Sequence, residues 1–176
     1  GIGIRTSSTD NIIITGNTLT NNVDDGIYSE GDERLQIKNN VITSNDRNGI
    51  TIMWTGSGLT GDCQSGVGSA SPPIDERSGW LQFTVKQNTV SGNDESGIES
   101  NGYRDVCFIQ NTVNSNGVHG FNIHNSQGGI FTNNVANDNN SIGFNFGSGT
   151  TPMSCMQGQC LFAFTGNSAS NNGQNY

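Results

Sequence analysis

Apolar and polar residues alternate along short segments that are spread over the whole chain. Alternation with a period of two places successive side chains on opposite faces, which is typical of β-strands. The segments are too short for helices, so the chain is predicted to be all-β. The alternating apolar positions include Ile12 and Ile14, Leu35 and Ile37, Phe83 and Val85, Val106 and Phe108, and Phe162 and Phe164.

A glycine followed by an apolar residue returns every 23 residues, apart from one interval of 48. Asparagine pairs five positions apart follow the same period, and none falls between Asn45 and Asn88. The long interval is therefore one repeat with about 25 inserted residues, and a later interval of 33 carries about ten. Insertions are expected near residues 55–79 and 148–158. The repeated positions are Gly3, Gly26, Gly49, Gly97, Gly120 and Gly143, and Asn17, Asn40, Asn88, Asn111, Asn134 and Asn167.

A repeat of 23 residues can hold three short strands joined by tight bends. Stacking successive repeats about 4.8 Å apart makes parallel sheets and lines up the Asn side chains at the bends. The repeat therefore predicts a right-handed, single-stranded parallel β-helix of about six to seven coils, in which the asparagines support the coil. Residues 1–176 are expected to form a single β-helix domain. Because neither end carries a cap, we expect further β-helix coils or a homo-oligomer as partners.

Composition alone would indicate disorder, since only 31% of the chain is apolar and 26 residues are Asn. The positional order of the repeat outweighs that indication, because it gathers apolar surface on one side of each strand. The formal charge of −8 at pH 7 argues against nucleic acid and against an anionic membrane surface as partners.

Four cysteines allow three disulfide connectivities. We predict the pairs Cys155 with Cys160 and Cys63 with Cys107. A metal site is the alternative, although no spacing typical of zinc is present. Disulfides in an acidic chain with few lysines favour a secreted, extracellular protein.

The pattern of Asn39 to Ile42, followed by Asn48-Gly49-Ile50, resembles the repeats of the pectin-lyase-like superfamily of right-handed β-helices. The resemblance covers essentially the whole chain and implies the fold. It also implies the functions of that superfamily, which include secreted polysaccharide lyases, uronate epimerases, glycoside hydrolases, tailspikes and adhesins. Asp24-Asp25-Gly26 and Val118-His119-Gly120 are similar to hydrolase motifs, but three coils separate them by about 14 Å, too far for one glycosidic bond.

Both insertions follow the same strand of the repeat, so they should project from one edge of the solenoid and wall a groove. Trp54 and Trp80 flank the longer insertion, where they could stack on sugar rings or anchor the loop. The groove floor is predicted to contain Glu99, Asn101, Tyr103, Arg104, Asp105, Asn122 and His124.

In this groove, Glu99 and Asn122 should share one outward column, and Asn101 and His124 the next. Proton abstraction beside a uronate carboxylate needs a base and a positive group. His124 or Tyr103 could be the base, with Arg104 holding the carboxylate and Glu99 orienting His124. The alternative is that residues 103–105 form a solvated turn with a local ion pair.

Asp24, Asp25, Glu30, Asp32 and Glu33 form an acidic cluster. Asp25, Glu30 and Asp32 are predicted ligands for a possible Ca²⁺ cofactor, or acid and base groups for hydrolysis. The alternative is a solvated edge whose charge is offset by Arg5 and Arg34, because the spacing matches no EF-hand.

Two classes of function follow. The first is a secreted polysaccharide lyase or C5-epimerase that acts on a uronate polysaccharide. The second is a non-catalytic structural or carbohydrate-binding β-helix, such as a tailspike, adhesin or fibre segment. A glycoside hydrolase is the third candidate.

Overall fold

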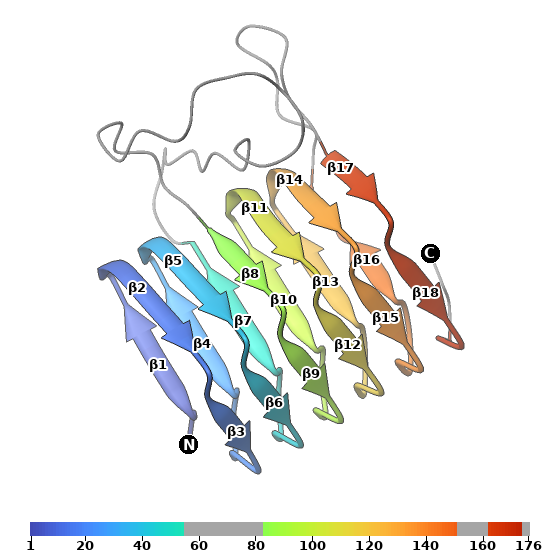
Figure 1. The fold of residues 1–176 in the computed structure, drawn as a ribbon, viewed down its shortest axis with the longest axis horizontal. Coiled ribbons are helices and arrows are strands. Elements are labelled where there is room, and N and C mark those ends of the chain that lie inside the picture. Colours follow the sequence, from blue (N-terminus) through green and yellow to red (C-terminus); the bar gives the residue numbers. More distant parts are fainter. Residues whose placement is uncertain (55–82, 151–161, 174–176) are drawn as a thin grey trace, which may run out of the picture.

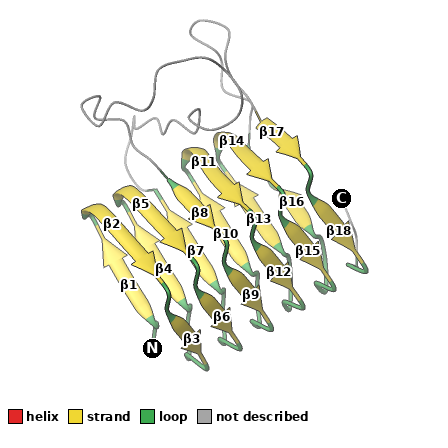
Figure 2. Cartoon of the chain, viewed as in Figure 1, coloured by secondary structure: helices red, strands yellow, loops and turns green. Residues whose placement is uncertain are grey.

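A computed structural model describes the backbone of residues 1–54, 83–150 and 162–173. These residues form three parallel sheets of six strands, and each turn of the chain contributes one strand to each sheet (Figure 1). The described residues comprise only strands and loops (Figure 2). The protein is therefore a right-handed parallel β-helix of about six coils, as the repeat predicts.

The strands have the following bounds. Sheet A contains β1 (Ile4–Ser7), β4 (Ile27–Glu30), β7 (Ile50–Met53), β10 (Ile98–Asn101), β13 (Phe121–His124) and β16 (Phe144–Phe146). Sheet B contains β2 (Asp10–Thr15), β5 (Glu33–Lys38), β8 (Thr84–Lys86), β11 (Arg104–Ile109), β14 (Gln127–Thr132) and β17 (Phe162–Thr165). Sheet C contains β3 (Thr18–Thr20), β6 (Val41–Thr43), β9 (Thr89–Ser91), β12 (Thr112–Asn114), β15 (Val135–Asn137) and β18 (Ser168–Ser170).

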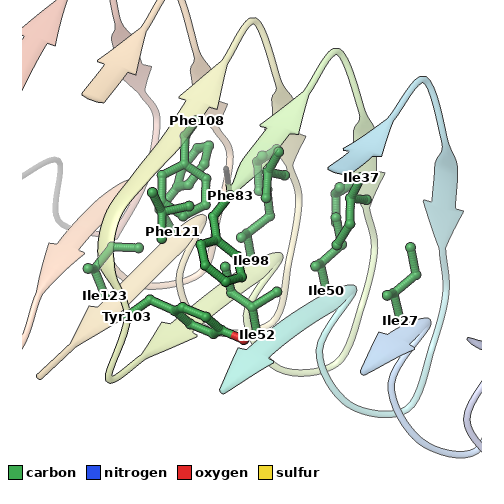
Figure 3. Packing of buried hydrophobic residues seen from close by; sticks show 14 of the residues in the cluster. Ile27, Ile37, Ile50, Ile52, Phe83, Ile98, Tyr103, Phe108, Phe121 and Ile123 are labelled. Atoms are coloured by element: carbon green, nitrogen blue, oxygen red, sulfur yellow. The ribbon is translucent and has the colours of Figure 1, made fainter. Parts of the chain in front are cut away.

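The core fills the space between the three sheets with columns of equivalent apolar side chains (Figure 3). Ile27, Ile50 and Ile98 lie in register on successive strands of sheet A, and each is fully buried. Farther along the same column, the rings of Phe121 and Phe144 stack with their centroids 4.8 Å apart. Burial of each such side chain contributes about 1.5–3 kcal/mol. The core therefore accounts for the strict recurrence of apolar residues in the sequence.

Buried asparagines link the coils at two corners, as the sequence predicts. At the corner between sheets B and C, Asn111 donates from its backbone N and its Nδ2 to Oδ1 of Asn134, at 3.0 and 2.9 Å. Asn111 Nδ2 also donates to the backbone carbonyl of Val85 at 2.8 Å. Asn93 and Asn116 belong to the second ladder, between sheets C and A. A buried amide with satisfied donors and acceptors stabilises the coil, whereas an unpaired one would destabilise it.

Both interruptions of the repeat lie at the corner between sheets A and B, which we call the A–B corner. One falls between β7 and β8 and the other between β16 and β17. The predicted insertions at 55–79 and 148–158 lie almost wholly outside the described residues. The sheets continue in register across the first interruption, because β7 pairs with β10 and β5 pairs with β8. None of the described segments is a helix of the length and apolar character that a membrane span requires.

Candidate functional site

The outward face of sheet A brings four of the predicted site residues together. Glu99 pairs with Asn122, and Asn101 pairs with His124, in the register of β10 and β13. All four side chains are half-buried, whereas the alternate residues Ser100 and Ile123 are buried in the interior. The two predicted outward columns are therefore confirmed. Glu99 and His124 lie diagonally across the pair, with their Cα atoms roughly 8 Å apart, so a bound molecule can contact both.

Hydrogen bonds to neighbouring coils hold three of these side chains. Glu99 Oε2 accepts a hydrogen bond from Asn48 Nδ2 at 3.3 Å. Asn145 Nδ2 donates to Asn122 Oδ1 at 2.8 Å, which extends the polar column by one coil. Asn125 Nδ2 donates to Asn101 Oδ1 at 3.0 Å. The interactions preorganise the polar groups that a ligand would meet.

His124 lies against Gly147 on the next coil. A Cβ atom at Gly147 would come within 2.3 Å of His124 Nδ1, so only glycine leaves room for the imidazole in this position. Within the described part of the chain, no side chain forms a hydrogen bond with that imidazole. The ring is thus placed by packing against Gly147, and the residue is half-buried on the outward face.

Tyr103 corrects one prediction, because its side chain points inward instead of lining the outward face (Figure 3). Only 2% of the residue is exposed, and its ring packs against Phe83 with the centroids 4.3 Å apart. Burial, with a smaller contribution from the negative charge of Asp32, raises the pKa of the Tyr103 phenol well above its usual value. Tyr103 is a core residue at the A–B corner, and its placement in the groove was wrong.

Of the other residues predicted to lie around this corner, only Trp54 has a described side chain. Arg104 and Asp105 begin β11 and therefore belong to sheet B, while their side chains lie outside the described part of the structure. Trp80 also lies outside it. Trp54 is half-buried and packs against the core, with its ring centroid 5.7 Å from that of Tyr103. This contact agrees with the loop-anchoring alternative for Trp54.

The three predicted calcium ligands do not converge. Asp25 is buried at the corner between sheets C and A, whereas Asp32 is buried at the A–B corner. Glu30 lies on the outward face of β4, where Arg5 approaches it at 3.8 Å. Within the described ranges, no group of three or more His, Cys, Asp or Glu side chains is arranged to hold a metal ion. The clustering predicted from sequence proximity was wrong, because corner residues turn in different directions.

Four hydrogen-bond donors surround the carboxylate of Asp32. Its carboxylate accepts hydrogen bonds from the hydroxyls of Thr6, Thr9 and Ser29 at 2.5 to 2.6 Å, and from the backbone N of Thr9 at 2.8 Å. Burial alone would raise the pKa of Asp32, but the four donors outweigh it and hold the pKa below its usual value. Asp32 therefore joins the first two coils as a buried, ionised acceptor.

Asp25 and His119 occupy equivalent positions in a third ladder, at the corner between sheets C and A. Asp25 Oδ1 accepts from Asn48 N at 3.0 Å, and His119 Nδ1 accepts from Ile142 N at 3.3 Å. Burial raises the pKa of Asp25. Burial and then repulsion from His124 lower the pKa of His119. Because Nδ1 accepts, neutral His119 carries its proton on Nε2, which lies 3.5 Å from Asn145 Nδ2. The ladder position explains His119 without a catalytic role.

Cys107 takes part in a disulfide. It alternates with the inward side chains of Val106 and Phe108, yet only 8% of the residue is exposed. Cys63, Cys155 and Cys160 lie outside the described residues, so the two predicted pairings stay predictions.

The sheets and corner ladders define a right-handed parallel β-helix. A family model described as a right-handed beta helix region matches residues 1–63. Among solved structures, the chain is similar to a double mutant of the periplasmic alginate epimerase AlgG, with a TM-score of 0.52 and 14% sequence identity. The match covers 98% of this chain and 47% of that protein, so this chain spans about half the length of the epimerase. No curated protein matches the chain.

Proposed function

We propose that this β-helix processes a polysaccharide outside the cytoplasm, and that it acts on a uronate polymer as a lyase or C5-epimerase. The observation that carries the proposal is the placement of Glu99, Asn101, Asn122 and His124 on neighbouring coils of one outward face. These coils lie between the two interruptions of the repeat. The structural similarity to a periplasmic alginate epimerase supports the same class of substrate.

His124 is the base in the proposed reaction. Neutral imidazole takes the proton from the carbon beside the uronate carboxylate, and the electron pair moves toward that carboxylate. In a lyase, the electrons then expel the glycosidic oxygen, and the imidazolium returns a proton to it. An epimerase instead needs a second donor, such as water, that protonates the carbon from the opposite face.

The remaining groups bind the sugar and neutralise its charge. The amides of Asn101 and Asn122 donate hydrogen bonds to sugar hydroxyl or carboxylate oxygens, and Glu99 accepts from a hydroxyl or from protonated His124. Arg104 is the candidate for the positive group that holds the carboxylate. Tyr103 takes no part, because its phenol is buried.

The test is incubation with a panel of uronate polymers, with and without calcium. Ultraviolet absorbance reports unsaturated lyase products, and nuclear magnetic resonance reports the ratio of sugar epimers. His124→Ala should lower kcat by at least about a hundredfold, as expected for loss of a positioned base. Glu99→Gln should have a smaller effect, about tenfold.

Ser91→Ala is the matched control, because Ser91 lies outward on β9 in sheet C, away from the site. It should retain full activity. Retained activity in His124→Ala would remove His124 as the base. If no polymer is changed by the unaltered protein, the lyase and epimerase assignments both fail.

One observation favours a second candidate, a non-catalytic carbohydrate-binding β-helix. Catalytic histidines are usually oriented by a hydrogen bond to one ring nitrogen, and none of the described side chains supplies one to His124. A binding protein needs only the outward polar columns. Binding of the polymer, measured by calorimetry, without any change in absorbance or epimer ratio would select this candidate.

A further inference from the structure

The two lysines of this chain lie side by side, although 48 residues separate them in the sequence. Lys38 ends β5 and Lys86 ends β8, and the two residues are partners in the parallel register of sheet B. Adjacent strands place them about 4.8 Å apart along the axis of the β-helix. The inward neighbours Ile37 and Val85 are buried in the core, so both lysines belong to the outward face.

The lysines differ from the arginines that the structure describes. Each of these arginines forms an ion pair. Arg5 pairs with Glu30, and Arg34 pairs with Asp10. Arg47 pairs with both Asp24 and Glu95. In the described part of the chain, neither lysine lies within 4 Å of a carboxylate. This is notable because acidic residues outnumber basic ones by 15 to 7. Among the described residues, the pair is thus positive charge without a neighbouring carboxylate, in a chain that is acidic as a whole.

The neighbours of the pair in sheet B carry no charge. On the flanking coils the same column holds Thr15 and Ile109. Lys38 Nζ donates to Gln36 Oε1 at 3.5 Å, and the exposed amides of Asn39 and Gln87 follow directly at the corner. Like charges that face each other on neighbouring strands are destabilising. An anion between the two ammonium groups would remove that cost and gain two charge-assisted hydrogen bonds.

We infer that Lys38 and Lys86 form an auxiliary binding site for the carboxylate groups of a uronate polymer. The inference rests on the proposed uronate substrate, which is the polyanion that an otherwise acidic protein must hold. Strands of six residues in sheet B span roughly 20 Å, so the pair is too far from the A–B corner to contact the sugar at His124. It would bind a different segment of the polymer, and holding two segments raises the overall affinity.

The test compares binding of a uronate polymer, measured by isothermal calorimetry or affinity electrophoresis. Lys38→Gln with Lys86→Gln should weaken binding about tenfold at low salt and reduce its salt dependence. Lys38→Arg with Lys86→Arg should retain binding, since the charge is kept. Arg34→Gln with Arg47→Gln removes the same charge elsewhere and should change binding less than twofold. The carboxyl-reduced, neutral polymer should bind equally to all variants.

Equal binding by the lysine double variant, or equal weakening by the arginine double variant, would overturn the inference. Turnover of short uronate oligomers separates it from the proposed function, because these ligands reach only one site. Loss of the lysines should leave that turnover unchanged. Lysine-dependent binding without any turnover would keep the inference and end the enzymatic proposal. Turnover together with binding that does not depend on the lysines would keep the enzymatic proposal and overturn the inference.

Discussion

The phenolic oxygen of Tyr103 lies 3.4 Å from the backbone carbonyl oxygen of Asp32, to which it donates a hydrogen bond. The contact joins a coil before the first interruption of the repeat to a coil after it. It also replaces the groove role expected for Tyr103 with a structural one, because the ring fills the core beside Phe83.

Substitution of Tyr103 should therefore change stability and not catalysis. Tyr103→Phe loses one buried hydrogen bond and should lower the free energy of unfolding by about 1 kcal/mol. Tyr103→Ala leaves a cavity and should cost about 3–5 kcal/mol. Urea unfolding measures both. If folded Tyr103→Phe protein loses turnover of a polymer that the unaltered protein converts, Tyr103 has a role in the reaction.

Asp32 should make stability depend on acid. Its pKa in the folded chain is lowered, so its stabilising contribution is present above the unfolded value of 3.8 and is lost as the pH falls through the lower folded value. Asp32→Asn should cost about 2 kcal/mol at neutral pH, because the carboxylate accepts four hydrogen bonds. The difference from the unaltered protein should shrink by about pH 3. A difference that does not vary with pH would contradict an ionised Asp32.

Asp25 should behave in the opposite sense. Burial raises its pKa, so the charged form carries a cost at neutral pH that disappears as the pH falls toward 3.8. Asp25→Asn keeps the oxygen that accepts from Asn48 N and removes the buried charge. Thermal unfolding at neutral pH should show a gain of about 1 kcal/mol, or roughly 3 °C. A lower unfolding temperature would mean that the attraction to Arg47 outweighs the cost of burial.

Because of His119, the protein should lose stability in mild acid. Its folded pKa is lowered from 6.5, so stability decreases as the pH falls from 6.5 through the folded value, where Nδ1 must take a proton and can no longer accept from Ile142 N. His119→Asn places the residue type of Asn48 at this ladder position and should flatten that dependence. Unfolding temperatures at about pH 7 and pH 5 provide the measurement. An unchanged slope would exclude His119 as its source.

The buried asparagines should contribute far more to stability than exposed ones. Asn111→Ala would leave ladder partners on both sides without their hydrogen bonds, at a cost of about 3 kcal/mol. Asn140→Ala, at an exposed corner position, is the control and should change stability by less than about 0.5 kcal/mol. Equal effects in urea unfolding would contradict the structural role of the ladder.

The repeat predicts the fold because each coil places the same residue types in the same environments. The pairing of Glu99 with Asn122 and of Asn101 with His124 follows from strand alternation, and the structure has both pairs. Tyr103, Asp25 and Asp32 were misplaced for a common reason. They lie at corners, where the backbone turns and a period of two no longer tells which way a side chain points.

The lysine pair was not predicted from the sequence, for a different reason. Lys38 and Lys86 are neighbours only because the coils stay in register across the first interruption. Counting basic residues in the sequence shows that they are few and does not show that two of them meet. The relevant signal was available in the repeat, since each lysine lies two residues before a ladder asparagine, Asn40 or Asn88.

The A–B corner has one more consequence. The contacts that hold each coil in register come from the strands and ladders on either side of the corner. Residues 55–82 separate β7 from β8 in the sequence, yet β8 still pairs with β5 of the preceding coil. A longer connection adds only a slowly growing loop-closure entropy. The scaffold can therefore acquire or exchange recognition segments at this corner, one coil at a time, while the alignment of every other coil is preserved.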